Sequence, residues 1–147
     1  MGAQAVLVAN RGEIAVRVLR AAAELGLRTV AVHAAEDEAH LRAADEAVPV
    51  GGYLNADDIL AAALDTGCEL LHPGYGFLSE DAEFARRCAE SGITFVGPAP
   101  EVLALFGDKA RARTLAFELG VPVLPGSRGV ATPDEARELL AEGPVID

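Results

Sequence analysis

The chain has 147 residues, the size of one domain, and can bury about two-thirds of the surface of its unfolded form. Its 12 Lys and Arg residues stand against 23 Asp and Glu residues, and the formal charge of -11 argues against nucleic acid or an anionic membrane as partner. Without a signal-peptide pattern or an apolar run long enough to span a membrane, we expect a cytoplasmic protein.

The start of the chain predicts a strand, a helix and a second strand. Ala5–Ala9 is a continuous apolar run, typical of a parallel strand buried on both faces. A helix is expected from Glu13 to Gly26, followed by a strand over Arg28–Val32, which makes a Rossmann-like β-α-β unit. The predicted apolar face of the helix is Ile14, Val18, Leu19, Ala22 and Leu25, with Arg17, Arg20 and Glu24 opposite.

The next stretch reads less regularly. Residues 34–47 predict short polar helical pieces on the surface, and residues 48–50 an edge strand, because Pro49 removes a ladder donor. A helix is expected over residues 57–66 and a strand over residues 69–71. The predicted apolar face of this helix is Ile59, Leu60, Ala63 and Leu64. Cys68 and Cys88 lack metal-ligand spacing and are expected to be buried, reduced thiols.

Residues 72–80 form a strand-to-helix turn, the position at which open α/β sheets place their sites. Its two glycines suggest backbone brought close to a ligand, and Tyr75 and Phe77 add aromatic surface. A tight turn whose aromatic rings fill the core explains the same residues equally well.

Ser79 is the predicted N-cap of a helix that reaches about Ser91, and a strand follows over residues 94–96. Residues 101–106 and 109–119 predict two helices, the second capped by Asp108. A linker, a helix from Thr132 and an unfinished strand at residues 145–147 complete the chain. We therefore expect one domain over residues 1–124 and, over residues 125–147, the incomplete start of another.

The first turn, residues 9–14, lacks the G-x-G-x-x-G pattern of dinucleotide-binding proteins and holds only Gly12. Glu13 would also repel a phosphate at the helix N-terminus. Binding of a nicotinamide cofactor is therefore disfavoured.

Three motifs, in order, match a known family: residues 8–15 (Val-Ala-Asn-Arg-Gly-Glu-Ile-Ala), 72–80 (His-Pro-Gly-Tyr-Gly-Phe-Leu-Ser-Glu) and 107–109 (Gly-Asp-Lys). They closely resemble the N-terminal domain of biotin carboxylase, the ATP-grasp component of acetyl-, propionyl- and pyruvate-type carboxylases. The resemblance runs from about Val6 to Ile146. It implies a three-layer, Rossmann-like preATP-grasp domain with a mostly parallel sheet, followed by the start of a truncated ATP-grasp region.

The resemblance also implies a reaction, in which ATP and bicarbonate give carboxyphosphate, and carboxyphosphate carboxylates N1 of biotin. It implies ATP, magnesium and biotin as cofactors of the full-length enzyme. The implied partners are the rest of the chain, a biotin carboxyl carrier protein or domain, a carboxyltransferase and a second copy in a homodimer. The family's magnesium ligands and catalytic groups lie beyond Asp147, so none is assigned here and the chain alone is expected to be inactive.

Residue by residue, the resemblance assigns Lys109 to the ATP phosphates, and assigns a wall of the biotin and carboxyphosphate pocket to Tyr75, Gly76 and Phe77. A solvated surface lysine is the simpler interpretation of Lys109. His72 has no carboxylate at triad-like spacing and is read as a structural hydrogen-bonding residue.

Arg20 and Glu24 are assigned by the resemblance to the homodimer interface, and a weak i, i+4 surface pair is the simpler interpretation. The chain departs from the family in the short Gly51-Gly52 connection, in Asp81 and in Asp147. Another ATP-grasp ligase, such as a carbamoyl-phosphate synthetase or a purine-pathway ligase, and a non-catalytic α/β interaction module are the alternatives.

Overall fold

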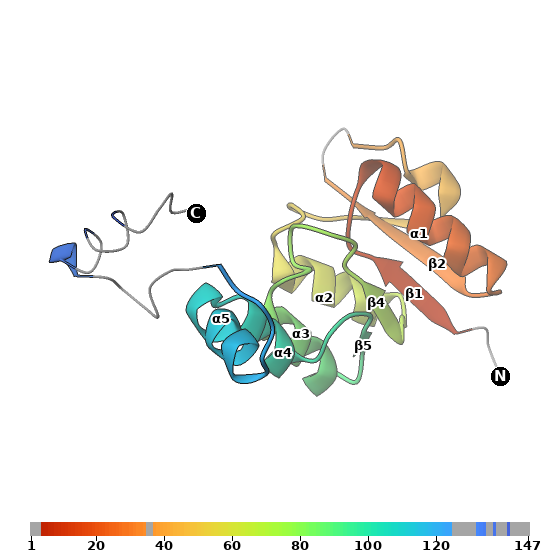
Figure 1. Cartoon of the computed structure of the whole chain (residues 1–147). Coiled ribbons are helices and arrows are strands. Elements are labelled where there is room, and N and C mark those ends of the chain that lie inside the picture. The colour runs from red at the N-terminus through yellow and green to blue at the C-terminus, as the bar shows by residue number, and fades with distance from the viewer. Residues whose placement is uncertain (1–3, 35–36, 125–131, 135–136, 138–140, 142–147) are drawn as a thin grey trace. The chain divides into compact units, whose positions relative to one another are not determined.

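The computed structural model describes residues 4–34, 37–124, 132–134, 137 and 141 (Figure 1). The chain divides into two compact units, Met1–Leu103 and Ala104–Asp147. The strands of the first unit are β1 (Ala5–Val8), β2 (Arg28–His33), β3 (Glu46–Pro49), β4 (Leu70–His72) and β5 (Thr94–Phe95). Its helices are α1 (Gly12–Glu24), the 3₁₀ turn η1 (Leu41–Ala43), α2 (Ala56–Asp65) and α3 (Ala82–Glu90). Helix α4 (Pro100–Phe106) crosses the boundary and α5 (Lys109–Glu118) belongs to the second unit.

The five strands form one sheet in the order β3-β2-β1-β4-β5, and every pair is parallel. The expected parallel sheet is therefore confirmed. β1 lies at the centre, where Val6 is opposite both Thr29 and Leu70. β3 lies at an edge, as Pro49 predicted. The chain runs outward from β1 to β3 and then returns to β4 on the other side, so the strand order reverses between β1 and β4.

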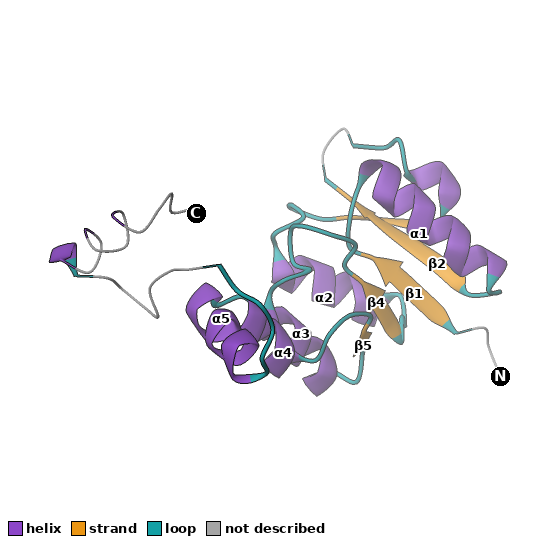
Figure 2. Ribbon diagram, viewed as in Figure 1, coloured by secondary structure: helices purple, strands orange, loops and turns teal. Residues whose placement is uncertain are grey.

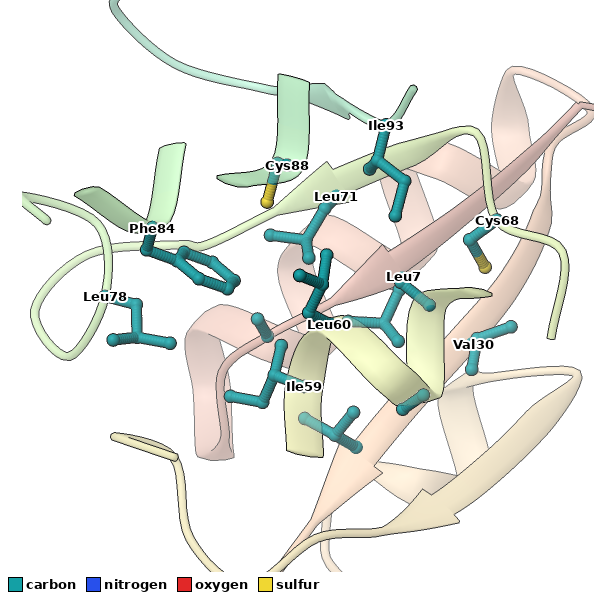
Figure 3. Close-up of a cluster of buried hydrophobic side chains, with 14 of the residues drawn as sticks. Leu7, Val30, Ile59, Leu60, Cys68, Leu71, Leu78, Phe84, Cys88 and Ile93 are labelled. Carbon is teal, nitrogen blue, oxygen red and sulfur yellow. The ribbon is translucent and has the colours of Figure 1, made fainter. Parts of the chain in front are cut away.

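Helices cover both faces of the sheet, which gives the three layers that were expected (Figure 2). On one face Ala15 and Leu19 of α1 pack with Val8 and Ala31. On the other face, α2 and α3 pack over β1, β2 and β4 (Figure 3). The largest fully buried apolar side chains there are Leu7, Val30, Val32, Ile59, Leu71, Phe84 and Cys88.

The predicted helix faces are wrong at two leucines. Leu25 is 79% exposed because α1 ends at Glu24, and Leu25 is the C-cap rather than part of the buried face. Leu64 is 52% exposed because the buried side of α2 is centred on Ile59 and Ala63, and Leu64 falls beyond its edge. Ala62 is buried instead.

The segment before β3 contains one short helical piece among its described residues, the 3₁₀ turn η1, so the expected short polar helical pieces are confirmed only in part. His40 is fully buried, with Nε2 at 2.8 Å from the Val32 carbonyl oxygen. The Asp45 carboxylate accepts hydrogen bonds from both the amide and the hydroxyl of Thr29, each at 2.8 Å. These bonds hold the segment against β2, and β3 begins early, at Glu46.

The predicted N-cap at Ser79 is wrong, because α3 begins at Ala82 and is capped by Asp81. The Asp81 side chain accepts a hydrogen bond from the Phe84 amide at 2.9 Å. The Ser79 amide instead donates to the Gly76 carbonyl at 2.9 Å, which closes a turn before the helix. Ser79 and Asp81 are both residue types that cap helices. Because Ser79 is part of the preceding turn, Asp81 caps α3.

Both cysteines are free and buried, as predicted. Burial raises the pKa of the Cys88 thiol to about 11 and also raises the pKa of Cys68. Among the described residues no helix is long and apolar enough to cross a membrane. Pro133 and Asp134 are helical. The predicted linker, residues 121–129, has neither helix nor strand over residues 121–124, and its remainder lies outside the described residues, as does the strand expected at residues 145–147.

Candidate functional site

The turn after β4 lies beside the end of β1, at the point where the strand order reverses. The Ala9 amide donates to the His72 carbonyl at 2.9 Å, so the backbone pairing of β1 with β4 reaches one residue past β1. The turn itself, residues 73–81, then leads to α3. Open α/β sheets bind ligands outside this edge, and the parallel topology accounts for the position of the turn.

A buried asparagine joins the two segments. Asn10 is 2% exposed, and its Nδ2 donates to the carbonyls of Pro73 at 2.7 Å and Tyr75 at 2.9 Å. Its Oδ1 accepts from the Arg11 amide at 2.9 Å. Sequence patterns alone gave Asn10 no individual role. The available signal was a polar residue directly after a fully apolar strand, where a side chain is buried only if its polar groups are paired.

The backbone of the turn is left-handed at three positions. Gly74 has φ +69°, and a Cβ atom there would lie 2.5 Å from Asn10 Nδ2. Gly76 has φ +65°, and Phe77, which carries a side chain, has φ +46°. A non-glycine residue in this conformation costs of order 1–2 kcal/mol, and such strain persists where the surroundings hold it.

The two aromatic side chains of the turn do not fill the core. Tyr75 is 62% exposed, and its hydroxyl donates to Glu13 Oε1 at 3.2 Å. Phe77 is 42% exposed and packs on the Tyr53 ring, with ring centroids 5.2 Å apart. Leu78 occupies the core position of the turn. Tyr75 and Phe77 therefore leave aromatic surface available at the edge of the sheet.

His72 acts as a hydrogen-bond acceptor within the turn. Its Nδ1 accepts from the Gly74 amide at 3.0 Å. Burial lowers the pKa of His72, which favours the neutral imidazole that such an acceptor requires. This geometry agrees with the structural role read from the sequence.

Lys109 is the first residue of α5, in the second unit, and its side chain is exposed. The Asp108 carboxylate caps the helix and accepts from the amides of Ala110 at 3.0 Å and Arg111 at 3.1 Å. The cap therefore occupies these two amides, and the exposed Lys109 ammonium is the cationic group nearest to them in the sequence. Lys109 is also the only lysine among the 147 residues, a feature of the sequence that sets it apart from the arginines.

Arg20 and Glu24 lie on the exposed side of α1 rather than in the turn after β4. The described residues include no ion pair between them. With Glu13, Val16, Arg17 and Ala21 they line a shallow surface hollow. The simpler interpretation, a weak surface pair, therefore does not describe their geometry.

The structure thus gathers Tyr75, Gly76 and Phe77 in one turn, whereas Lys109 belongs to the other unit. Within the described part of the chain, no three His, Cys, Asp or Glu side chains are grouped so as to hold a metal ion.

A family model for the biotin carboxylase N-terminal domain matches residues 2–103. The chain is 50% identical over 146 residues to the biotin carboxylase of Nostoc sp., covering 93% of this chain and 33% of that protein. The chain spans about a third of the length of that biotin carboxylase, and 13% of the length of the pyruvate carboxylase of Schizosaccharomyces pombe, to which it is 50% identical.

Two solved structures superpose closely on the chain. The biotin carboxylase domain of a single-chain bacterial carboxylase has a TM-score of 0.90 at 51% identity, covering 95% of this chain and 34% of that one. The biotin carboxylase domain dimer of Hydrogenobacter thermophilus 2-oxoglutarate carboxylase, in complex with MgADP, ADP and bicarbonate, has a TM-score of 0.89 at 48% identity. That match covers 95% of this chain and 32% of the other.

Proposed function

The chain belongs to the biotin carboxylase N-terminal domain family, and from this premise we propose that it forms the first part of an enzyme that carboxylates biotin. In that reaction bicarbonate attacks the γ-phosphate of ATP to give carboxyphosphate and ADP. The carboxyl group then passes to N1 of biotin, which gives up its proton, and phosphate leaves as the C–O bond of carboxyphosphate breaks. Magnesium and the groups that perform these steps belong to the remainder of the enzyme.

The observation that carries this proposal is the turn at residues 73–81. It lies at the edge where open α/β sheets bind ligands, it holds strained backbone at Phe77, and its aromatic rings are exposed rather than packed in the core. We infer that the backbone of Tyr75, Gly76 and Phe77 forms one wall of the biotin and carboxyphosphate pocket. The other walls come from outside residues 1–124, which we propose as the extent of the domain.

Lys109 is proposed to contact the ATP phosphates. Eleven of the twelve cationic side chains are arginine, and the exception falls in the Gly107-Asp108-Lys109 motif. A lysine ammonium is a compact point charge that suits phosphate oxygens, as in other phosphate sites. The exposed side chain beside a capped helix end is free to reach such a ligand.

A joined enzyme tests the function. In it, this chain is followed by the part of the Nostoc biotin carboxylase that lies after the matched region. We expect the joined enzyme to cleave ATP in a manner that depends on bicarbonate and free biotin, and the isolated chain to show only background cleavage. Turnover by the isolated chain would contradict its proposed inactivity, and a folded joined enzyme without cleavage would contradict the proposed function.

The hollow on α1 is proposed as part of a homodimer interface, because Arg20 and Glu24 are exposed there without pairing to each other. Sedimentation of the joined enzyme tests this. Arg20→Glu is expected to weaken the dimer, whereas Arg42→Glu, an equal charge change at an exposed site in η1, should leave it intact. If the two variants dimerise equally well, this face of α1 is not part of the homodimer interface. The carrier and the carboxyltransferase are proposed as the partners of the complete enzyme.

A further inference from the structure

Asn10 continues the hydrogen bonding between β1 and β4 beyond the last backbone pair. That last pair joins the Ala9 amide to the His72 carbonyl at 2.9 Å. One step further, both N–H groups of the Asn10 side chain face carbonyls, those of Pro73 and Tyr75. Its oxygen accepts from the Arg11 amide. The buried side-chain amide thus uses both donors and its acceptor, so none of its polar atoms is left unpaired.

The two carbonyls lie on either side of Gly74. Because one amide group holds both of them, it orients the Pro73–Gly74 peptide and the Tyr75–Gly76 peptide, and the left-handed Gly74 lies between the two bonded carbonyls. The fit is close, since a Cβ atom on Gly74 would lie 2.5 Å from Asn10 Nδ2. The left-handed positions Gly76 and Phe77 follow directly. The conformation of the turn is therefore tied to β1, the central strand of the sheet.

We propose that Asn10 is a positioning residue, which presets the backbone of Tyr75, Gly76 and Phe77 before substrate binds and thereby raises the affinity for biotin. The consequence for biotin rests on the proposed function, whereas the effect on the turn rests on the hydrogen bonds alone. A wall that is already ordered spares the substrate the entropy cost of ordering it.

The proposed role requires a side chain with two N–H donors and an acceptor, as asparagine has. An aspartate at position 10 keeps the shape and the bond from the Arg11 amide, but as a carboxylate it cannot donate to either carbonyl. A serine donates once. Thr29→Val is a matched control. Thr29 lies near the start of β2, away from the turn, and the substitution removes its buried hydroxyl, which donates to the Asp45 carboxylate.

Hydrogen exchange on the isolated chain tests the effect on the turn. The Ser79 amide, which donates to the Gly76 carbonyl, reports on the turn, and the Val96 amide, which donates to the Leu71 carbonyl, reports on the sheet. In Asn10→Asp we expect Ser79 to exchange at least about tenfold faster relative to Val96. Thr29→Val should leave that ratio within about twofold. An unchanged ratio in Asn10→Asp, or in Asn10→Ser if the aspartate variant does not fold, would overturn the proposal.

Steady-state kinetics of the joined enzyme test the effect of Asn10 on biotin affinity. In Asn10→Ser the KM for free biotin should rise at least about fivefold while the KM for ATP stays within about twofold. Equal changes in both constants, or none, would overturn the role in biotin affinity. If the unsubstituted joined enzyme fails to carboxylate biotin, the proposed function is wrong, and the exchange ratio of Ser79 to Val96 still decides whether Asn10 holds the turn.

Discussion

The Phe77 ring lies on the Tyr53 ring, with the ring centroids 5.2 Å apart and the planes inclined by 32°. Tyr53 is buried, and its hydroxyl oxygen accepts from the Ala34 amide at 3.3 Å, just past the end of β2. Phe77 is the residue of the turn that carries a side chain at positive φ. The contact therefore holds a strained residue of the proposed pocket wall against a fixed part of the fold.

Replacement of Tyr53 should destabilise the first unit according to how much of the ring is lost. Tyr53→Ala is expected to lower the free energy of unfolding by about 3 kcal/mol, because it leaves a cavity and frees Phe77. Tyr53→Phe removes the hydroxyl, which accepts from the Ala34 amide and also interacts with the Asp37 carboxylate, and should cost about 1 kcal/mol. Urea unfolding of both variants measures the difference. Similar losses in the two variants would show that the ring contact does not stabilise the fold.

The cap of α3 provides a direct comparison of two neighbouring residues. Asp81→Ala should lower the free energy of unfolding by about 1 kcal/mol, because it removes the acceptor for the Phe84 amide. Ser79→Ala should change it by less than about 0.5 kcal/mol, since the Ser79 side chain does not cap the helix. Thermal unfolding of the two variants measures this. A larger loss of unfolding free energy in Ser79→Ala than in Asp81→Ala would indicate that Ser79 caps the helix.

His72 should make stability depend on pH. Its pKa is lowered in the folded protein, so its contribution is fully present above its unfolded pKa of about 6.5 and is lost as the pH falls below that value. Protonation at Nδ1 also removes the acceptor for the Gly74 amide. We expect the free energy of unfolding to fall more between about pH 7.5 and about pH 5.5 in the wild type than in His72→Asn, which keeps an acceptor. Parallel pH profiles would contradict this role.

Replacement of Lys109 should raise the KM for ATP more than the KM for biotin in the joined enzyme. Lys109→Met removes a charge-assisted contact to phosphate and is expected to raise the KM for ATP at least about tenfold. Arg111→Met, an exposed cation in the same helix, should change it less than about twofold. Steady-state kinetics with ATP varied measure both values. A rise of the same size in Arg111→Met would indicate a general effect of charge.

Local sequence patterns predicted the framework of the fold but not the contacts that shape the site. The apolar run at β1 and the 3.6-residue period of α1 are local signals, and both elements were confirmed. The bonds from Asn10 reach Pro73 and Tyr75, which are 63 and 65 positions away along the chain, so no local pattern contains them.

Packing and turn geometry explain the remaining differences. His40 is buried in a stretch whose composition is polar, because Asp45 and Thr29 hold that stretch against β2. Ser79 and Asp81 are both capping residues, and the bond from the Ser79 amide to the Gly76 carbonyl selects Asp81. The roles of Lys109, Tyr75, Gly76, Phe77, Arg20 and Glu24 stay predictions, as do the boundary at residue 124 and the cytoplasmic location.

Transfer of labelled carboxylate from bicarbonate to free biotin in the joined enzyme is the most direct measurement of the central claim. We predict labelled carboxybiotin that requires ATP and magnesium, and its amount should fall in Lys109→Met but not in Arg111→Met. A folded joined enzyme that cleaves ATP yet leaves biotin unlabelled would contradict the claim that this chain forms part of a biotin carboxylase site.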